Sequence, residues 1–586
     1  MMKSRRTSIA PLRPPPQSCA HFLRHVGAIS LAATLWLAAA GRASAQTIDP
    51  EALLAHVRYL ASDELAGREA GEPGADRAAT YIARLMRAFD LLPLGNEGYL
   101  QSFNITTTIS ISPQSQLLLE TPDSARLLEL YSEWLPFSFS SPGRVRGEAY
   151  RAGYGLSPDS LGDRQGEYLN GKVVFMRGGA SDDSNPHAAG SDATPRFKVT
   201  SARQQGAPAA LIGVARIQTP QSGEPPRPVG IPAGQVIESE EILEWLDADE
   251  LRITLDAALE PVVARVHNVV GYVPGGDPEL RDQVIVIGAH YDHLGLGGPG
   301  SLAPDTNEPH NGADDNASGT AVMLELARYF AENEARRPAR SLVFVAFTAE
   351  EMGLLGSGHF VQRPPVRLER VTAMINFDMV GRLRNQSLQL FGTGTAEEFP
   401  ALLDSLAATS PLSITQIGDG YGPSDQTSFY ARGIPVLHLF TGVHAEYHRP
   451  DDDWEFINEA GMAEVARFSI ALIDVLGNLP AELTFVEQAP PRVSGGGYGP
   501  YLGTIPDFGE VAGGGVRLTG VRPDSPAERA GLQGGDIVIE FGGTRVLNLY
   551  DYTYALRAHS PGDTVAITVK RNGRELELSA VLERRQ

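Results

Sequence analysis

The chain has 586 residues, with 49 Lys and Arg against 71 Asp and Glu, and a single cysteine. At roughly 100 to 200 residues per domain, this length predicts three or four globular units. The formal net charge of −22 disfavours a nucleic-acid partner or an anionic membrane surface, because both would be repelled. Cys19 lies near the N-terminus, which excludes disulfides and thiolate metal sites from the rest of the chain. Any metal there must be held by His, Asp or Glu.

The first 45 residues have the features of a secretory signal. They contain basic residues and no acid, an apolar stretch covers residues 26–40, and Ala43-Ser44-Ala45 supplies the small residues of a cleavage site. An apolar stretch of about 15 residues is short for a membrane-spanning helix, although an uncleaved anchor stays the alternative. We therefore expect a signal peptide over 1–45, a secreted or periplasmic protein, and no stable membrane span after cleavage.

Two helices and a β-rich insertion are predicted next. Apolar residues at three- and four-residue spacings predict two helices within 48–89, separated by a turn in the Gly-rich stretch 67–74. From about residue 104 to residue 263 the sequence pattern changes to short runs that contain β-branched residues, such as 173–176 and 209–214. This change predicts an inserted domain rich in β-strands.

Strands and helices then alternate up to about residue 476. The expected strands cover 284–288, 342–347, 373–377 and 435–440, and the expected helices cover 318–332 and 461–476. Continuous apolar strands separated by helices indicate a mostly parallel, mixed sheet flanked by helices, so the fold class is α/β. In such a sheet the chemistry is expected at the strand ends.

Acidic and imidazole side chains follow these strand ends. His290 and Asp292 are two residues apart and face the same side in an extended chain. The other candidates at strand ends or at the start of the helix are Asp314, Asp315, Glu350, Glu351, Asp378 and His448. Each alone is typical of a loop charge or a helix cap. Two imidazoles and three carboxylates at one sheet edge, however, suit a pair of zinc ions, with one more carboxylate to move protons.

Five motifs carry a resemblance to a known family. They are HYDH, GADDNASG, TAEEMGLLGS, NFDMVG and YHRPDD. They occur in the order found in the co-catalytic zinc exopeptidases related to bacterial leucyl aminopeptidase and glutamate carboxypeptidase. Over residues 48–103 and 266–476 the chain resembles this family. The resemblance implies a zinc peptidase domain made of residues 46–103 and 264–480.

The resemblance also implies a role for each matched residue. One zinc ion would be held by His290 and Asp378, the second by Glu351 and His448, and Asp315 would bridge the two. Glu350 would act as general base and acid, and Asp292 would orient His290 through its other ring nitrogen. Tyr421 would polarise the substrate carbonyl, with an ordinary turn residue as the alternative.

Residues beside the motifs receive other expectations. Asp314 is expected to cap the helix or to lie behind the ligands, and Ser424 and Asp425 to cap a helix beginning near Thr427. The stretch 295–300 fits G-x-G-x-x-G, but no helix follows it promptly, so a dinucleotide site is disfavoured. Three further histidines are expected only on loops: His293, His310 and His444.

Two accessory domains are expected around the peptidase domain. Residues 104–263 resemble a protease-associated domain, which would bind or restrict substrates or would be a structural cover. Residues 481–500 form a Pro/Gly-rich linker, and residues 501–586 closely resemble bacterial PDZ domains, which bind a peptide C-terminus or only pack against their own chain. The residues that fit the carboxylate-binding loop are Tyr501, Leu502, Gly503 and Thr504.

The sequence as a whole predicts a dizinc exopeptidase that acts on peptides, with an aminopeptidase favoured. A carboxypeptidase or dipeptidase is the alternative, because the same metals serve whichever end of the substrate is recognised. A metal-free binding scaffold on the same fold is a third hypothesis. Loss of ligands would mark such a scaffold, whereas all five expected ligands are present here.

Overall fold

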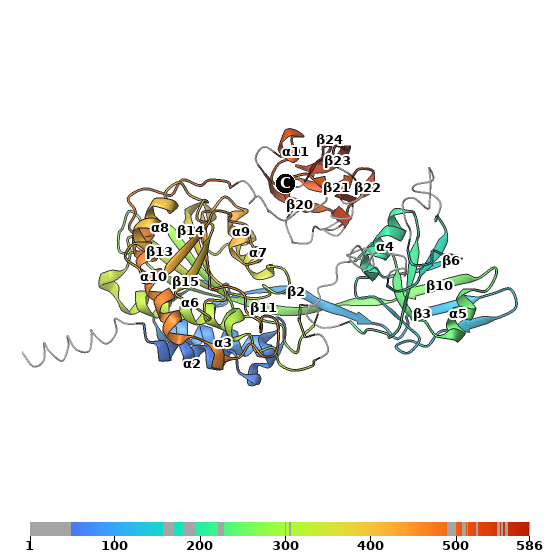
Figure 1. Ribbon diagram of the computed structural model, residues 1–586, viewed down its shortest axis with the longest axis horizontal. Coiled ribbons are helices and arrows are strands. Elements are labelled where there is room, and N and C mark those ends of the chain that lie inside the picture. Colours follow the sequence, from blue (N-terminus) through green and yellow to red (C-terminus); the bar gives the residue numbers. More distant parts are fainter. Residues whose placement is uncertain are drawn as a thin grey trace, which may run out of the picture. The chain divides into compact units, whose positions relative to one another are not determined.

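The computed structural model of the protein describes most of the chain beyond the expected signal (Figure 1). The described residues are 48–155, 169–179, 194–220, 228–298, 300–303, 306–488, 500–506, 511, 514–522, 525–547, 551–552, 555–556, 559 and 561–584. The expected signal at 1–45 and most of the expected linker lie outside them. Among these residues, no helix combines the length and the apolar character that crossing a membrane requires.

Two helices open the first domain, as predicted. Helix α2 (Pro50–Leu60) and helix α3 (Pro73–Ala88) each have proline in the first turn, where its fixed φ suits the helix and no amide hydrogen is needed. Asp49 caps α2 by accepting a hydrogen bond from the Glu51 amide at 3.1 Å. The Gly-rich interruption forms a short helical turn, η1 (Asp63–Arg68), with Gly67 at a φ of +69°.

A nine-stranded mixed sheet, counted over the described residues, forms the centre of this domain. Its order is β1-β11-β13-β12-β14-β17-β15-β16, and β2 also pairs with β11. The bounds are β1 Leu92–Pro93, β2 Leu100–Ile111, β11 Leu259–Val273, β12 Val284–His290, β13 Ser341–Phe347, β14 Val371–Phe377, β15 Ser387–Phe391, β16 Ser413–Ile417 and β17 Val436–Phe440. Strands β13, β12, β14 and β17 run parallel, and β11 and β15 border them antiparallel. The predicted α/β class with a mixed sheet is confirmed.

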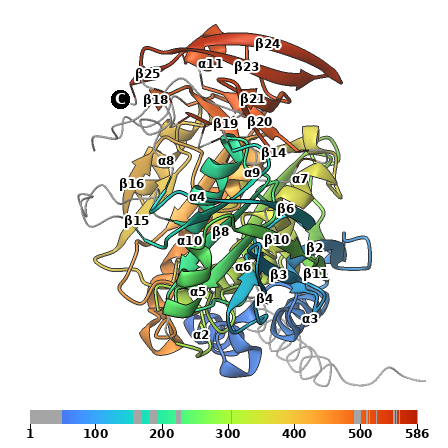
Figure 2. The same cartoon turned by 90° about the vertical axis from the view of Figure 1, so that its right-hand side faces the viewer.

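Helices cover both faces of this sheet (Figure 1). On one face α2 and α3 lie with α6 (Gly319–Glu332) and α10 (Glu459–Gly477), and α8 (Phe399–Ala407) contacts α10. On the other face α7 (Leu355–Gln362) packs against α9 (Gln426–Tyr430), as Figure 2 also shows. Every residue of β12 and β13 is buried, which explains why these strands are continuous apolar runs in the sequence.

The insertion between β2 and β11 contains its own sheet, with eight strands in the part that the structure describes. Its order is β4-β3-β10-β6-β7-β8-β9-β5. The bounds are β3 Gln116–Glu120, β4 Ala125–Leu127, β5 Trp134–Pro136, β6 Gly143–Arg151, β7 Lys172–Met176, α4 Pro195–Gln204, β8 Ala209–Val214, β9 Ala233–Ile237, α5 Glu240–Leu246 and β10 Arg252–Ala257. Strands β2 and β11 extend past residues 104 and 263 and pair from Leu100 with Val269 to Ile111 with Leu259, with a β-bulge where the register shifts between Val262 and Val263.

The C-terminal part forms a further β-rich unit. Its described elements are β18 Pro500–Tyr501, β19 Thr504–Pro506, β20 Val516–Val521, α11 Pro526–Arg529, β21 Ile537–Phe541, β22 Thr544–Arg545, β23 Thr564–Arg571, β24 Arg574–Val581 and β25 Glu583–Arg584. In the expected carboxylate-binding loop, Gly503 has a φ of +88°, and a β-carbon there would lie 2.3 Å from the Ser525 β-carbon. Only glycine fits this position.

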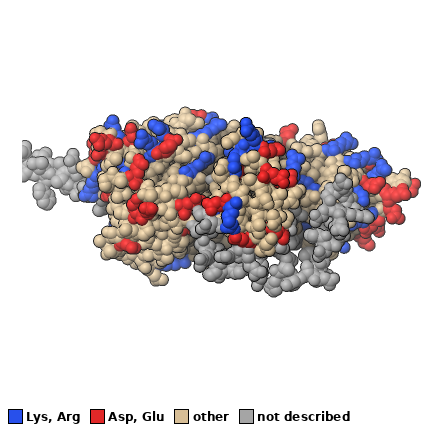
Figure 3. Space-filling view, turned by 90° about the horizontal axis from the view of Figure 1, so that it is seen from above, with Lys and Arg blue, Asp and Glu red and all other residues tan. Residues whose placement is uncertain are grey.

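Acidic and basic side chains are mixed on the surface. On the face seen in Figure 3, blue and red side chains alternate over the described residues. On this face the acidic side chains are therefore interspersed with basic ones and not gathered in one patch.

Candidate active site

The predicted site residues converge at one edge of the central sheet. His290 is the last residue of β12, Glu350 and Glu351 follow β13, and Asp378 follows β14. Because these strands are parallel neighbours, their C-terminal ends meet at the same edge. Asp315, in the turn η4 (Ala313–Ser318) that opens α6, and His448, in the loop after β17, reach the same place.

Asp315 lies between two imidazoles. Its Oδ1 is 3.3 Å from Nε2 of His290, and its Oδ2 is 3.2 Å from Nε2 of His448. The carboxylate is buried, so its two oxygens have little access to water. Each oxygen therefore faces a different imidazole, which is the arrangement that a bridging carboxylate needs.

One group of potential ligands surrounds His290. Its Nε2 is 3.5 Å from Oδ1 of Asp378, and potential ligand atoms of His290, Glu350 and Asp378 all lie within 4.8 Å of one another. Oδ1 of Asp378 is buried and has no hydrogen-bond partner within the described part of the chain. An unsatisfied buried carboxylate oxygen is costly, and a cation at this position would satisfy it. The donor set of nitrogen and oxygen atoms fits zinc.

The second group of potential ligands includes His293, a histidine expected only on a loop. Oε2 of Glu351 lies 3.4 Å from Nε2 of His448, and Oε1 of Glu351 lies 2.8 Å from Nδ1 of His293. Potential ligand atoms of His293, Asp315 and Glu351 also lie within 4.8 Å of one another. His293 is on a loop, as expected, but it is buried and bonded into the site.

Backbone carbonyls orient the two expected histidine ligands. Nδ1–H of His290 donates to the carbonyl of Asp292 at 3.2 Å, and Nδ1–H of His448 donates to the carbonyl of Gly300 at 2.8 Å. With the proton on Nδ1, the Nε2 lone pair of each ring is left for a metal ion. The glycine stretch 295–300 thus contributes an acceptor to the site.

Asp292 differs in one respect from its expected role. Its carboxylate lies 3.8 Å from the His290 ring, too far for the expected hydrogen bond, because its own main-chain carbonyl is closer to the ring. The carboxylate instead accepts hydrogen bonds from the amides of Glu350 at 3.1 Å and Glu351 at 3.4 Å. Asp292 therefore contacts the two glutamates through its side chain and the histidine through its backbone.

The two adjacent glutamates differ in proton affinity. Burial raises the pKa of Glu350 well above its ordinary value, and the negative charges of Glu351 and Asp425 add to this rise. Burial also acts to raise the pKa of Glu351, but hydrogen bonds with His293 and His448 outweigh it and lower that pKa to about 2. Glu350 thus holds a proton more tightly than an ordinary glutamate does, while its neighbour Glu351 stays anionic.

A network of buried charges lies behind Asp315. Oδ2 of Asp452 accepts hydrogen bonds from the amides of Asp314 at 3.0 Å and Asp315 at 3.1 Å. Asp452 also pairs with Arg382 at 3.3 Å, and Asp314 lies 3.3 Å from Nε2 of His444. The expectation that Asp314 lies behind the ligands agrees with this geometry. His444 is a loop residue, as expected, but it is buried and ion-paired.

A buried arginine connects two of the loops that carry the site residues. Arg68, the last residue of η1, is 1% exposed. Its guanidinium donates to the carbonyls of Tyr291 at 2.7 Å, Asn311 at 2.6 Å and Gly312 at 3.0 Å, and to that of Leu60. Burial lowers its pKa to about 10, so the group stays charged at neutral pH and offsets the surrounding acids.

Two tyrosines are relevant to the expected polarising group. Tyr421 is partly buried, and its ring lies edge-on to Tyr430 with 4.6 Å between centroids. Tyr447 stacks on the His448 ring at 3.8 Å. Burial and then the charges of the site acids, led by Asp315, raise the pKa of Tyr447. Tyr447 thus lies close enough to the site acids for their negative charges to affect its hydroxyl. The role of Tyr421 stays a prediction.

The capping roles predicted for Ser424 and Asp425 are wrong. Helix α9 begins at Gln426, and the Asp425 side chain, although at the N-cap position, makes no capping hydrogen bond. It is fully buried, and burial raises its pKa to about 7. The Ser424 hydroxyl accepts a hydrogen bond from Asn376 at 2.8 Å. Both side chains point into the domain, where packing overrides the local preference for capping.

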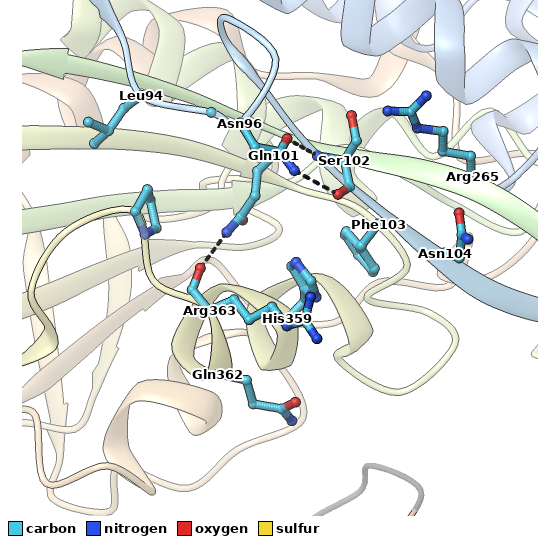
Figure 4. Close-up of a pocket in the computed structure, with 12 residues that line it drawn as sticks. Leu94, Asn96, Gln101, Ser102, Phe103, Asn104, Arg265, His359, Gln362 and Arg363 are labelled. Atoms are coloured by element: carbon cyan, nitrogen blue, oxygen red, sulfur yellow. Dashed lines mark hydrogen bonds between the residues drawn. The ribbon is translucent and has the colours of Figure 1, made fainter.

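Two other features lie outside this cluster. His310 is buried on its loop and bonds Ser301 Oγ through Nε2 at 2.7 Å. A cavity of about 1050 Å³ opens beside β2, β11 and α7 (Figure 4), and none of the predicted site residues lines it. There the rings of Phe103 and His359 stack at 4.1 Å.

Comparison with known proteins places the chain in a family. The model of peptidase family M28 matches residues 268–473, and that of the PDZ domain matches residues 497–582. A probable aminopeptidase of Saccharomyces cerevisiae is 30% identical over 262 residues, which cover 41% of this chain and 67% of that relative. The chain belongs to peptidase family M28.

Other relatives of this M28 family member are matched over smaller shares of their length. An aminopeptidase of Bacillus subtilis is 30% identical over 203 residues, which cover 32% of this chain and 40% of the relative. The chain thus spans less than two thirds of that protein. A solved aminopeptidase from Aneurinibacillus sp. strain AM-1 matches with a TM-score of 0.48 and 23% identity, over 75% of this chain and 96% of that one.

The M28 region contains all five expected ligands, but it does not contain every residue that shapes the site. Arg68 lies 200 residues before residue 268, where the family match begins. In the sequence, only the position of Arg68 inside the Gly-rich stretch 67–74 could have drawn attention to this residue. Tyr447 had a clearer signal, because it directly precedes the histidine of the YHRPDD motif.

Proposed function

We propose that this M28 peptidase is a zinc-dependent aminopeptidase that removes N-terminal residues from peptides. The observation that carries the proposal is the placement of Asp315, with each carboxylate oxygen facing a different imidazole. The relatives in Saccharomyces cerevisiae and Bacillus subtilis, which carry the names of aminopeptidases, support the choice among exopeptidases.

Two zinc ions would be held by five side chains of the site. His290 and Asp378 would hold one ion, Glu351 and His448 the other, and Asp315 would contact both. The buried, unsatisfied Oδ1 of Asp378 and the Nε2 atoms of both histidines, which face the carboxylate of Asp315, support this assignment. Bound zinc would polarise the scissile carbonyl and make a water molecule a better nucleophile.

The chain's own residues would then move the protons. Glu350 would accept a proton from the attacking water and return it to the leaving amine, so that the carbon–nitrogen bond is replaced by a carbon–oxygen bond. Asp292 would hold the backbone amides of Glu350 and Glu351 in place. Tyr421, by the family resemblance, would donate a hydrogen bond to the developing oxyanion.

The remaining parts of the chain receive proposals from the sequence. Residues 1–45 would direct the protein to the periplasm or the exterior and be removed. Residues 46–103 and 264–480 would form the peptidase, residues 104–263 a protease-associated domain, and residues 501–586 a PDZ domain. The loop from Tyr501 to Thr504 would bind the C-terminus of a peptide, since its position between β18 and β19 suits strand addition.

Metal content and cleavage of a peptide panel would test the proposed function. The protein without residues 1–45 should contain close to two zinc ions and cleave peptides with a free N-terminus, including C-amidated ones. N-blocked peptides should resist cleavage. Cleavage that requires a free C-terminus would instead identify a carboxypeptidase or dipeptidase. A protein that binds no zinc and cleaves no peptide would instead be a binding scaffold.

A further inference from the structure

The histidine beside Glu351 has no role in the mechanism described so far. His293 follows β12 by three residues, and its side chain is completely buried. Nδ1 of its ring lies 2.8 Å from Oε1 of Glu351. Because an ionised carboxylate only accepts hydrogen bonds, the ring must donate through Nδ1–H. The contact is therefore a charge-assisted hydrogen bond in a site shielded from water.

This contact makes the two oxygens of Glu351 different. Oε1 is bonded to His293, whereas Oε2 faces Nε2 of His448 at 3.4 Å. The same nitrogen of His448 lies 3.2 Å from Oδ2 of Asp315. Only Oε2 is thus turned toward the space between His448 and Asp315, where the second metal ion would be held.

The ring of His293 is fixed from several sides. Its backbone amide donates to the carbonyl of Arg68 at 3.2 Å. Its ring meets that of His448 nearly at a right angle, with 5.6 Å between centroids. On another side lies Gly312, where a β-carbon would come within 2.6 Å of the ring. With little room to turn, His293 presents its donor to Glu351 in one orientation.

Asp292 and His293 together hold Glu351 at both ends. Oδ2 of Asp292 accepts the hydrogen bond from the Glu351 amide at 3.4 Å, and His293 holds its carboxylate. Glu350 is held by Asp292 only at its amide, and its carboxylate lies in the other group, with His290 and Asp378. Glu350 therefore belongs to the group of potential ligands around His290, and Glu351 belongs to the group around Asp315 and His293.

We propose that His293 is a positioning residue that commits one oxygen of Glu351 to a hydrogen bond and leaves the other for the second metal ion. In this way it decides which of two adjacent glutamates serves as a ligand. The inference rests on the proposed function, since it presumes that two zinc ions bind.

Zinc binding to the metal-free protein would test this inference without substrate. His293→Phe keeps a ring but removes the donor, and His293→Asn places an amide N–H close to the position of Nδ1. Titration with zinc against a chromophoric chelator should show two ions bound by the unaltered protein. For His293→Phe the affinity for one of the two ions should fall about 10- to 100-fold, and His293→Asn should recover most of it.

His267→Phe is a matched control. His267 lies in β11 of the same domain, is partly buried, and bonds the Ser102 hydroxyl through Nδ1 at 2.8 Å. The same substitution there should leave both zinc affinities unchanged. Unaltered affinities in His293→Phe, or no recovery in His293→Asn, would overturn the inference. An unaltered protein that binds no zinc would overturn the proposed function itself.

A crystal structure of the unaltered protein with zinc provides a test that does not depend on the folding of variants. Glu351 should contact one ion through Oε2 alone, with Oε1 still within hydrogen-bond distance of Nδ1 of His293. A Glu351 that binds through both oxygens, turned away from His293, would contradict the inference.

Discussion

Glu350 and Glu351 are adjacent and chemically identical, so their different behaviour has to come from their surroundings. Burial raises the pKa of Glu350, whereas hydrogen bonds with His293 and His448 lower that of Glu351 despite the opposing effect of its own burial. A general base needs an accessible proton equilibrium, and a ligand needs a persistent negative charge. These surroundings support the proposed roles, with the base at position 350 and the ligand at position 351.

The first prediction separates catalysis from metal binding. Glu350→Gln should lower kcat by about 10²- to 10⁴-fold, because the amide cannot take up the proton, while two zinc ions remain bound. Peptide hydrolysis and metal analysis of the same preparation would measure both. Glu455→Gln, at an exposed glutamate of the same domain, should leave both unchanged. A fully active Glu350→Gln variant would remove Glu350 from the mechanism.

The second prediction concerns the pH dependence of stability in the metal-free protein. Asp315 and Glu351 raise the pKa of His448 from 6.5 to about 11, against the opposing effect of burial. A raised histidine pKa stabilises the folded state fully below pH 6.5, and this contribution is lost as the pH rises through 11. His448→Gln should therefore be less stable than the unaltered protein near pH 6, with the difference shrinking at alkaline pH. Thermal unfolding after removal of zinc would measure it, and a difference that does not depend on pH would contradict it.

At the scale of elements, the site depends on loops that meet from distant parts of the chain. The guanidinium of Arg68 joins the end of β12, through Tyr291, to Asn311 and Gly312 ahead of η4. Asp452 then fixes the start of η4 from the other side through the amide of Asp315. The two loops are thus held by hydrogen bonds to the backbone, independently of the side chains that would bind zinc.

The third prediction follows from the buried bonds of Arg68. Arg68→Met should lower the free energy of unfolding by about 3 kcal/mol or more, because several buried carbonyls lose their donor and the nearby acids lose a compensating charge. Urea unfolding with and without zinc would measure the loss. Arg84→Met, on the exposed face of α3, should change stability by no more than about 0.5 kcal/mol. Equal effects of the two substitutions would contradict the connecting role of Arg68.

The elements that the sequence predicts well are those whose burial is uniform. Strands β12 and β13 are buried at every residue and stand out as apolar runs. The sequence did not predict β15 and the edge strand β16, because both are short and no residue of β16 is fully buried. The five expected ligands could be named because each belongs to a local motif. Contacts such as that of Arg68 with Gly312, 244 residues apart, depend on tertiary structure and have no local pattern.

At the scale of the whole molecule, the peptidase domain is interrupted by the insertion between two paired strands. Thr108 of β2 and Val262 of β11 are direct partners in the antiparallel pair. Beyond them Ile109 and Ile111 pack with Leu135 of the insertion. The two chain ends that leave the peptidase sheet are therefore neighbours, at a spacing that a hairpin turn can connect.

The fourth prediction is that the insertion can be removed. Replacing residues 109–261 by Asn-Gly should give a folded protein that binds zinc as the full chain does, because the shortened β2 and β11 keep their register. Circular dichroism and zinc titration would check this, with the same deletion joined by Pro-Pro as a control that cannot form the turn. A shortened protein that folds but no longer binds zinc would mean that the insertion supports the metal site. Peptide length preference, compared with the full chain, would report on restriction of substrates.

The pairing of β2 with β11 also has a consequence for how the chain is made. At about 5 to 20 residues per second, β11 leaves the ribosome roughly 7 to 30 seconds after β2, so these two strands of the peptidase sheet cannot pair until then. The strands of the insertion sheet all lie between the two and can assemble during this interval. Once folded, the insertion brings its two ends together, so the entropy of closing this long loop is lost before β2 and β11 pair. Because the insertion can fold first and bring β2 and β11 together, the peptidase sheet can begin to form from this pair of strands.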